Sequence, residues 1–308
     1  MPAQESSHLK AILLALFVTV LWSSSWVLIK FGLEDIPPLT FAGLRYTWAF
    51  LVLLPIALRS PAHRAAIRHL PRRDWLRLAL LGLVFYTTTQ GLAYVALVYL
   101  QAITLSLMLN FTTVAVAVLG IFWLRELPTT LQWAGVAVYL VGVVVYFTPL
   151  GAAEPVVGLI VGGIVVAANA VSALLGREIN RAGDLDPLTV TLVSMGVGSV
   201  VLLALGIAFQ GLPRIDLVGW LIVGWLAVVN SALAFTLWNQ TQRTLSATES
   251  SIINNTMLIQ VAVLAWLFLG EQLTLREVAG LALAALGILL VQVRGRRQQG
   301  RGVALRDA

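Results

Sequence analysis

The sequence predicts an all-α integral membrane protein with ten transmembrane helices in two inverted five-helix repeats. Three observations lead to this prediction. The composition is too apolar for a water-soluble domain, ten apolar segments are long enough to cross a bilayer, and the second half of the chain repeats the first. Together they describe a bundle of helices whose solvent is mainly lipid.

The composition sets the class of protein. Of 308 residues, 59% are hydrophobic and 11% are charged, whereas a soluble domain carries roughly a quarter of its residues as Asp, Glu, Lys and Arg. A chain this poor in charge cannot cover its own surface in water. The net charge is +6, but the basic residues flank apolar runs, as in cytoplasmic loops, so we expect no nucleic-acid partner.

The residue types exclude several kinds of site. Cys is absent, so neither disulfides nor thiolate chemistry is available. The three histidines lie in polar segments, which excludes a His-based metal site or a Ser-His-Asp triad inside the membrane. The sequence therefore predicts no metal, no cofactor and no catalytic residue. The first apolar run continues to Lys30 without a small-residue cleavage site, so we expect an uncleaved span.

Ten segments contain the roughly 20 apolar residues that a spanning helix needs. They are predicted near Ala11–Ile29, Leu39–Leu58, Trp75–Tyr94, Ala102–Leu124, Leu131–Phe147, Val156–Leu175, Pro187–Phe209, Leu217–Trp238, Ser250–Leu269 and Val278–Val293. The links are short, and the longest, Arg59–Asp74, is rich in Arg.

The Lys and Arg residues give the orientation. With the N-terminus in the cytoplasm, 16 of the 20 lie on the cytoplasmic side, and the opposite orientation would reverse this bias. We therefore expect a multi-pass protein of the inner (plasma) membrane with both termini in the cytoplasm. Residues 294–308 form the predicted basic cytoplasmic tail.

The two halves of the chain match each other. A shift of 145 residues aligns identical polar and small residues: Glu126 with Glu271, Thr129 with Thr274, Gly135 with Gly280, Gly142 with Gly287, Ser106 with Ser251 and Asn110 with Asn255. The predicted repeats are residues 1–150 and 151–293. Because each holds an odd number of spans, the second enters the membrane from the opposite side. Inverted repeats are typical of transporters with a midplane site.

These residues also carry a family resemblance. Trp22-Ser23-Ser24-Ser25-Trp26 followed by Lys30 resembles the first-span signature of the drug/metabolite transporter superfamily, with Ser23 in place of the usual glycine. Pro38 followed by Arg45 and Ala49 resembles its second span.

The turns at Glu126 and Glu271, each followed nine residues later by Gly, resemble the repeat ends of its EamA-type families. The resemblance covers about residues 10–293 and implies ten helices, two inverted repeats and metabolite export. Within the superfamily, the abundance of Trp and Tyr makes the chain most similar to the aromatic amino-acid exporters.

Polar and aromatic side chains inside the spans are candidates for a substrate pathway, because polar groups in lipid cost free energy unless they face protein or water. The predicted substrate-binding residues are Trp22, Ser25, Arg45, Tyr86, Gln90, Tyr94, Asn110, Asn169, Trp238 and Asn255. For the aromatic members, stacking on a substrate ring and membership of an interface belt are the two open interpretations.

Arg45 is the only charged group well inside a predicted span. An Arg at the bilayer centre costs about 2.5–3.5 kcal/mol on insertion scales. One interpretation is a counter-charge for a substrate carboxylate, or a gate. The other is a structural Arg that satisfies helix-end carbonyls or reaches toward the outer surface. The sequence leaves both open.

Three further sets of residues have alternative roles. For Asn110 and Asn255, lining a cavity is favoured over bonding between helices. For Glu126 and Glu271, an N-cap of the next helix is favoured over a proton carrier. The paired glycines indicate close helix packing, and Gly158 and Gly162 do so within the bundle or in a dimer.

The predicted function is a secondary transporter that exports small metabolites by alternating access, with amino acids (aromatic or other neutral) as the expected substrates. The alternatives are an integral-membrane transferase, and a drug, multidrug or nucleotide-sugar-type carrier of the same fold. The expected partners are a small-molecule substrate and the lipid bilayer, for a monomer or a weak homodimer. Proton-coupled and facilitated export both remain open.

Overall fold

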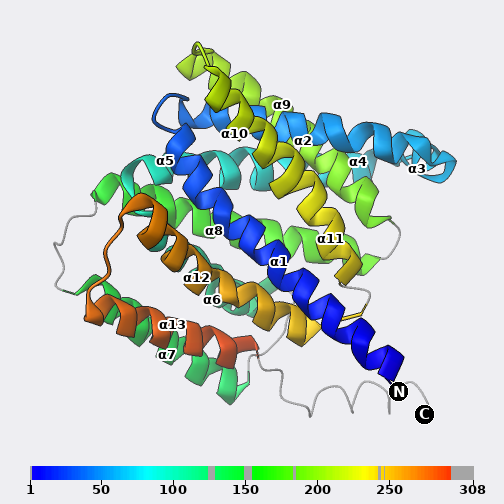
Figure 1. Ribbon diagram of the computed structural model, residues 1–308. Coiled ribbons are helices and arrows are strands. Elements are labelled where there is room, and N and C mark those ends of the chain that lie inside the picture. The colour runs from blue at the N-terminus through cyan, green and yellow to red at the C-terminus, as the bar shows by residue number, and fades with distance from the viewer. Residues whose placement is uncertain are drawn as a thin grey trace, which may run out of the picture.

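The computed structural model describes residues 2–123, 129–148, 155–182, 185–241, 244–245 and 247–292. All regular structure within these ranges is helical, which confirms the all-α class. The helices are α1 (Pro2–Gly32), α2 (Pro38–Arg59), α3 (Pro61–Arg68), α4 (Arg72–Gly82), η1 (Leu83–Gln90), α5 (Gly91–Tyr99), α6 (Ala102–Trp123), α7 (Thr130–Phe147), α8 (Val156–Ala182), α9 (Pro187–Gln210), α10 (Leu217–Ala227), η2 (Val228–Leu233), α11 (Ala234–Thr241), α12 (Ala247–Leu269) and α13 (Leu275–Gln292) (Figure 1).

Each of the ten predicted segments falls on one helix or on one run of consecutive helices. Among the described residues, eight helices are long and apolar enough to cross a membrane. The two segments outside this set lie on α6, of which the described stretch Ala102–Val116 is a shorter apolar helix, and on the 18-residue α13. The third and eighth segments each run through a π-helix, η1 or η2. The basic tail at 294–308 lies outside the described residues.

The longest predicted link contains an additional helix. Between α2 and α4, Pro61 begins the eight-residue α3. Proline favours the first helical position because its fixed backbone angle suits the helix and its missing N–H would have no intrahelical partner there. Pro38 and Pro187 begin α2 and α9 in the same way.

The helix caps correct one prediction. Glu271 does not cap the helix that follows it. Instead, Thr274 accepts from the Glu277 N–H at the start of α13, and Thr129 caps α7 through a capping box with Gln132. Glu126 lies outside the described residues.

Glu271 caps α6 instead. Its two carboxylate oxygens accept hydrogen bonds from the backbone N–H groups of Ala102 and Ile103, at 2.8 and 3.2 Å. Only 8% of Glu271 is exposed. A carboxylate at a helix N-terminus satisfies free N–H groups and faces the positive end of the helix dipole. This cap therefore joins the α12–α13 connection of the second half to α6 of the first.

The helices of one half pack mainly on helices of the other. The main pairings are α7 with α13, α2 with α9, α1 with α12, and α6 with α8. Figure 1 shows α13 beside α7, and α1 passing alongside α12. In the two halves, α1 corresponds to α8, α2 to α9, α6 to α12 and α7 to α13. The pairs α7–α13 and α2–α9 therefore each join two corresponding helices, and the pair α1–α12 corresponds to the pair α8–α6. This is the pattern that a two-fold relation between repeats produces.

Four glycines bring α7 and α13 close together, as predicted. A Cβ on Gly135 would lie 2.7 Å from the Gly287 carbonyl oxygen, and one on Gly142 would lie 2.7 Å from that of Gly280. Distances this short leave no room for a side chain. The 145-residue match aligns Gly135 with Gly280 and Gly142 with Gly287. Across the interface, Gly135 therefore meets the equivalent of Gly142, and Gly142 meets the equivalent of Gly135.

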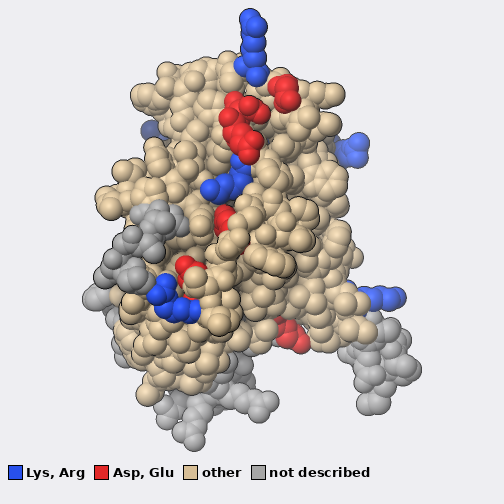
Figure 2. All heavy atoms as spheres, turned by 60° about the vertical axis from the view of Figure 1, so that its left-hand side comes forward, with Lys and Arg blue, Asp and Glu red and all other residues tan. Residues whose placement is uncertain are grey.

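The surface agrees with a membrane location. Figure 2 shows a surface that is mostly uncharged, with several Lys, Arg, Asp and Glu side chains down the middle of the face and a few Lys and Arg side chains at its edges. Large apolar side chains such as Ile160, Leu221 and Val263 are exposed on the helices. Exposed apolar side chains of this kind are stable when lipid covers them.

We predict that Gly135→Leu destabilises the protein, because the new side chain would collide with backbone atoms of α13. Inserting methylenes into a packed interface costs about 1–3 kcal/mol. The measurement is the thermal unfolding midpoint in detergent. Gly224→Leu is the control, since a Cβ there meets no atom within 4 Å and the variant should unfold near the wild-type temperature. Equal midpoints for Gly135→Leu and wild type would contradict this account of the interface.

We also predict that Glu271→Ala loosens the start of α6. Two buried N–H groups would lose their partner, and each buried unpaired group costs about 1–3 kcal/mol. Hydrogen–deuterium exchange should become faster at Ala102 and Ile103. Glu277→Ala is the matched control, because Glu277 acts in an exposed cap of α13 and its loss should leave exchange in α6 unchanged. Unchanged exchange in Glu271→Ala would refute the cap.

Candidate functional site

Two π-helices interrupt the bundle at equivalent places in the two halves. η1 begins at Leu83 and η2 at Val228, and the same 145-residue shift relates these positions. Hydroxyl groups bond five residues back along each segment: Thr89 to the Val84 carbonyl and Ser231 to the Leu226 carbonyl, both at 2.9 Å. Short π-helical stretches in long helices are frequent at functional sites.

Arg45 of α2 contacts η2 and α5. Its Nε donates to Ser231 Oγ of η2 at 3.3 Å, and its Nη1 donates to the Tyr94 hydroxyl of α5 at 3.1 Å. The guanidinium carbon lies 5.1 Å from the centre of the Tyr46 ring, within the range of a cation–π interaction. Arg45 is 7% exposed and Tyr94 is 1% exposed.

These contacts differ from both structural interpretations of Arg45. The side chain is buried rather than extended to the surface, and its hydrogen-bond partners are hydroxyl groups rather than helix-end carbonyls. Within the part of the chain that the structure describes, no carboxylate lies within 4.0 Å of Arg45. Arg45 is therefore a buried cation held by neutral groups, which orient its charge without neutralising it.

We call the cluster formed by Arg45, Tyr46, Gln90, Tyr94, Asn230 and Ser231 the polar centre. A second set of its contacts starts at Tyr46. Its hydroxyl donates to Gln90 Oε1 at 2.8 Å, and its ring meets that of Tyr86 edge-on at 5.4 Å. Gln90 and Tyr86 both belong to η1. The neighbouring residues Arg45 and Tyr46 therefore tie α2 to η2 and to η1, respectively.

Asn230 joins the first helix to η2. Its Nδ2 donates to the Leu21 carbonyl, and it also donates to Ser25 Oγ at 2.8 Å and Ser24 Oγ at 3.3 Å. In return, Trp22 Nε1 donates to the Asn230 backbone carbonyl at 3.1 Å. Asn230 is fully buried and precedes Ser231, so the contacts of α1 lie next to those of Arg45.

An aromatic cluster extends from this junction. The Trp22 ring lies 5.2 Å from that of Trp238 and 5.5 Å from that of Phe235, both of α11. Such tilted ring pairs are favourable beyond the area they bury. The cluster places three aromatic rings beside the polar centre, on the side of α1 and α11.

The structure links seven of the ten predicted residues through the contacts above: Trp22, Ser25, Arg45, Tyr86, Gln90, Tyr94 and Trp238. The three remaining predicted residues, all asparagines, take no part in the contacts described above. Asn110 Nδ2 bonds the Ser106 carbonyl of its own helix at 2.8 Å, and Asn169 Nδ2 bonds Thr112 Oγ1 at 3.2 Å. Asn255 is partly buried on α12. The bond of Asn110 is made within its own helix and not between helices.

A further polar connection was not among the predicted site residues. Gln260 of α12 accepts from Ser23 Oγ at 3.0 Å and donates to Thr19 Oγ1 at 3.1 Å. Gln260, Asn230 and Ser231 are polar residues within apolar runs, and this property made them candidates for the pathway, although they are not among the ten predicted substrate-binding residues.

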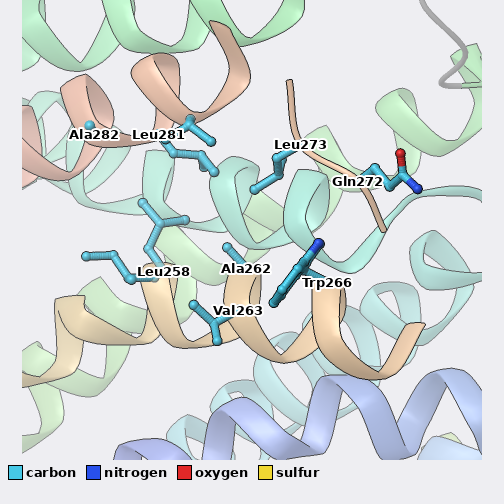
Figure 3. Close-up of a pocket in the computed structure, with 10 residues that line it drawn as sticks. Leu258, Ala262, Val263, Trp266, Gln272, Leu273, Leu281 and Ala282 are labelled. Carbon is cyan, nitrogen blue, oxygen red and sulfur yellow. The ribbon is translucent and has the colours of Figure 1, made fainter. Parts of the chain in front are cut away.

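Two apolar hollows lie away from the polar centre. One, of about 570 Å³, lies between α12 and α13, and Figure 3 shows Ala262 and Trp266 on one side of it with Leu281 on the other. The second, of about 640 Å³, lies among α6, α7 and α8 and is lined by Phe111 and Tyr139. Neither hollow is lined by any of the ten predicted residues.

Comparisons with known proteins agree with these features. The uncharacterized transporter YvbV of Bacillus subtilis (strain 168) is 28% identical over 96% of this chain and 96% of its own length. The uncharacterized inner membrane transporter YedA of Escherichia coli (strain K12) is 28% identical over 89% of this chain and 87% of its own. An S-adenosylmethionine/S-adenosylhomocysteine transporter of Chlamydia trachomatis (serovar L2) is 27% identical over 85% of this chain and 82% of its own.

A solved structure supports the fold. A crystal structure of a protein at 18% sequence identity has a TM-score of 0.68 to this chain, and the match covers 94% of this chain and 99% of that one. The model of the EamA-like transporter family matches twice, over residues 9–148 and 156–293. This chain is a multi-pass membrane protein that belongs to the EamA-like transporter family.

Proposed function

We propose that this protein is a secondary transporter that exports small amino-acid-type metabolites, and that Arg45 binds the carboxylate of the substrate. The observation that carries the proposal is the buried guanidinium of Arg45, which meets hydroxyl groups and an aromatic ring. An ionised residue inside a membrane protein marks a functional site, and its natural partner is an opposite charge.

A carboxylate fits Arg45 in shape as well as in charge. The guanidinium presents parallel N–H groups that match the two oxygens of a carboxylate. In a water-poor interior the attraction between the two charges is stronger than in water. Tyr94 and Ser231 fix the direction of the guanidinium before the substrate arrives, which reduces the ordering cost of binding.

One relative has named substrates of this chemistry. S-adenosylmethionine and S-adenosylhomocysteine, named for the Chlamydia trachomatis relative, each carry an α-amino acid group with its carboxylate. The rings of Trp22, Phe235 and Trp238 lie beside the polar centre and offer stacking surfaces for a side chain. Aromatic and other neutral amino acids share the same α-amino acid group and are the proposed substrates.

The arrangement of the halves suits alternating access. The proposal assigns residues 1–150 and 151–293 to two inverted five-helix repeats, with both termini in the cytoplasm. Arg45 belongs to the first repeat, and its partner Ser231 belongs to the second. A substrate at Arg45 would therefore lie between the repeats, where rocking of one against the other can expose it to either side in turn.

We predict that the purified protein in proteoliposomes transports neutral amino acids without ATP, and that Arg45→Gln lowers the kcat/KM at least about tenfold. A hydrogen bond to a charged group contributes about 1.5–3 kcal/mol, and 1.4 kcal/mol is a factor of ten. Arg45→Lys keeps the charge but loses the parallel N–H groups, so it should retain intermediate activity. The readout is uptake of a panel of radiolabelled amino acids.

Amino-acid amides provide the matched substrate control. They lack the carboxylate, so wild-type protein should transport them poorly and Arg45→Gln should affect them little. Absence of flux for every amino acid, or equal loss for acids and amides in Arg45→Gln, would contradict the proposal.

We also predict that Tyr94→Phe raises the KM several-fold with little change in the amount of folded protein. The variant keeps the ring that packs edge-on against Phe41 but loses the hydroxyl that holds Arg45. Tyr139→Phe is the control, because its hydroxyl donates to the Leu107 carbonyl, outside the polar centre. That control should keep the wild-type KM, and a similar KM in all three proteins would exclude Tyr94 from the site.

A further inference from the structure

One buried acceptor in the polar centre has no partner. Asn230 is 0% exposed, and its Oδ1 accepts no hydrogen bond. Three other buried side-chain atoms in the described part of the chain share this property, in His63, Thr189 and Ser250, and these lie near the ends of helices α3, α9 and α12. A buried carbonyl oxygen without a donor costs about 1–3 kcal/mol, so this oxygen needs an explanation.

The orientation of the Asn230 amide is fixed by its neighbours. The nitrogen and oxygen of an amide can be exchanged by a flip, and the hydrogen-bond network must decide between them. Here the Leu21 carbonyl lies against one end of the amide, and a carbonyl can only accept. That end must therefore be the Nδ2 group, which leaves the oxygen as the unpartnered atom.

The residue with the free oxygen is the chain neighbour of a hydrogen-bond partner of Arg45. Asn230 precedes Ser231 in η2, and Ser231 Oγ accepts from Arg45 Nε at 3.3 Å. Among the described residues, the polar centre therefore contains a cation with no carboxylate within 4.0 Å. The residue that precedes Ser231, one of the partners of this cation, carries an acceptor without a donor. An α-amino acid zwitterion carries the complement of both, because its carboxylate lies two bonds from its ammonium group.

We propose that Asn230 Oδ1 accepts a hydrogen bond from the ammonium group of the substrate, so that Arg45 and Asn230 together select α-amino acids over simple carboxylates. This inference rests on the proposed transport of carboxylate-bearing metabolites. Binding would satisfy the free oxygen with a charge-assisted hydrogen bond, which is stronger than one between neutral groups. A carboxylate without an amine would leave that oxygen unpaired.

The test compares substrates that differ only in the amine. The probes are L-phenylalanine and L-methionine with their desamino analogues, 3-phenylpropanoate and 4-(methylthio)butanoate, measured by competition for amino-acid uptake into proteoliposomes. Wild-type protein should prefer each amino acid over its analogue by about tenfold or more, as a site with a buried unpaired group rejects the molecule that leaves it unpaired. This measurement needs no variant, so it stands even if substitutions at Asn230 fail to fold.

Two variants test the assignment to Asn230. Asn230→Leu, of similar size, should reduce the preference for each amino acid over its desamino analogue to within about threefold. The desamino analogues should still compete in this variant, and Arg45→Gln should still abolish their competition. Ser24→Ala is the matched control, because it removes one partner of Asn230 Nδ2 and leaves the free oxygen in place. It should keep the wild-type preference.

The outcomes separate the two proposals. If no carboxylate competes, the transport proposal itself fails. If amino acids and desamino analogues compete equally well in wild-type protein while Arg45→Gln weakens both, the transport proposal stands and the role of Asn230 is wrong. If Asn230→Leu weakens the competition by amino acids and by desamino analogues equally, Asn230 only holds α1 in place and the inference is wrong.

Discussion

The bilayer offers no water to polar groups, and this constraint shapes every contact between the two halves of the protein. Each buried polar group must find its partner inside the bundle. Glu271 meets the N–H groups of α6 from the other half, and Asn230 meets α1 from the other half. Where no polar group is available, glycine lets backbones approach, as between α7 and α13. Arg45 also has hydrogen-bond partners, but they are neutral hydroxyl groups, and no carboxylate of the described residues lies within 4.0 Å of it. The oxygen of the Asn230 amide has no partner.

Close glycines, threonine caps and π-helices occur at equivalent positions in the two halves of the chain. Gly135 faces the equivalent of Gly142, and Gly142 faces the equivalent of Gly135. Thr129 and Thr274 cap equivalent helices. η1 and η2 interrupt equivalent spans. The polar residues that these π-helices carry differ between the halves, however. Gln90 and Tyr86 come from one, and Asn230 and Ser231 from the other. The two equivalent segments therefore supply different polar residues to one centre.

Patterns that depend on nearby residues were predictable from the sequence. The positions of the helices and the close glycines follow from hydropathy and from the repeat, and Arg45 stood out as the one charge inside a span. Partners distant in the chain were not predictable. Glu271 was expected to cap α13, but it caps a helix 169 residues away, a pairing that only tertiary packing decides. The π-helices leave no clear sequence signal, and Asn110 is satisfied by its own helix.

The central claim is that the unneutralised charge of Arg45 receives the carboxylate of the substrate. A structure of the protein in a lipid nanodisc with a transported amino acid bound tests this claim most directly. The account predicts a carboxylate oxygen within about 3 Å of an Arg45 guanidinium nitrogen, with Tyr94 and Ser231 still in contact with the same side chain. A bound amino acid whose carboxylate lies elsewhere, with Arg45 held only by its hydroxyl partners, would contradict it.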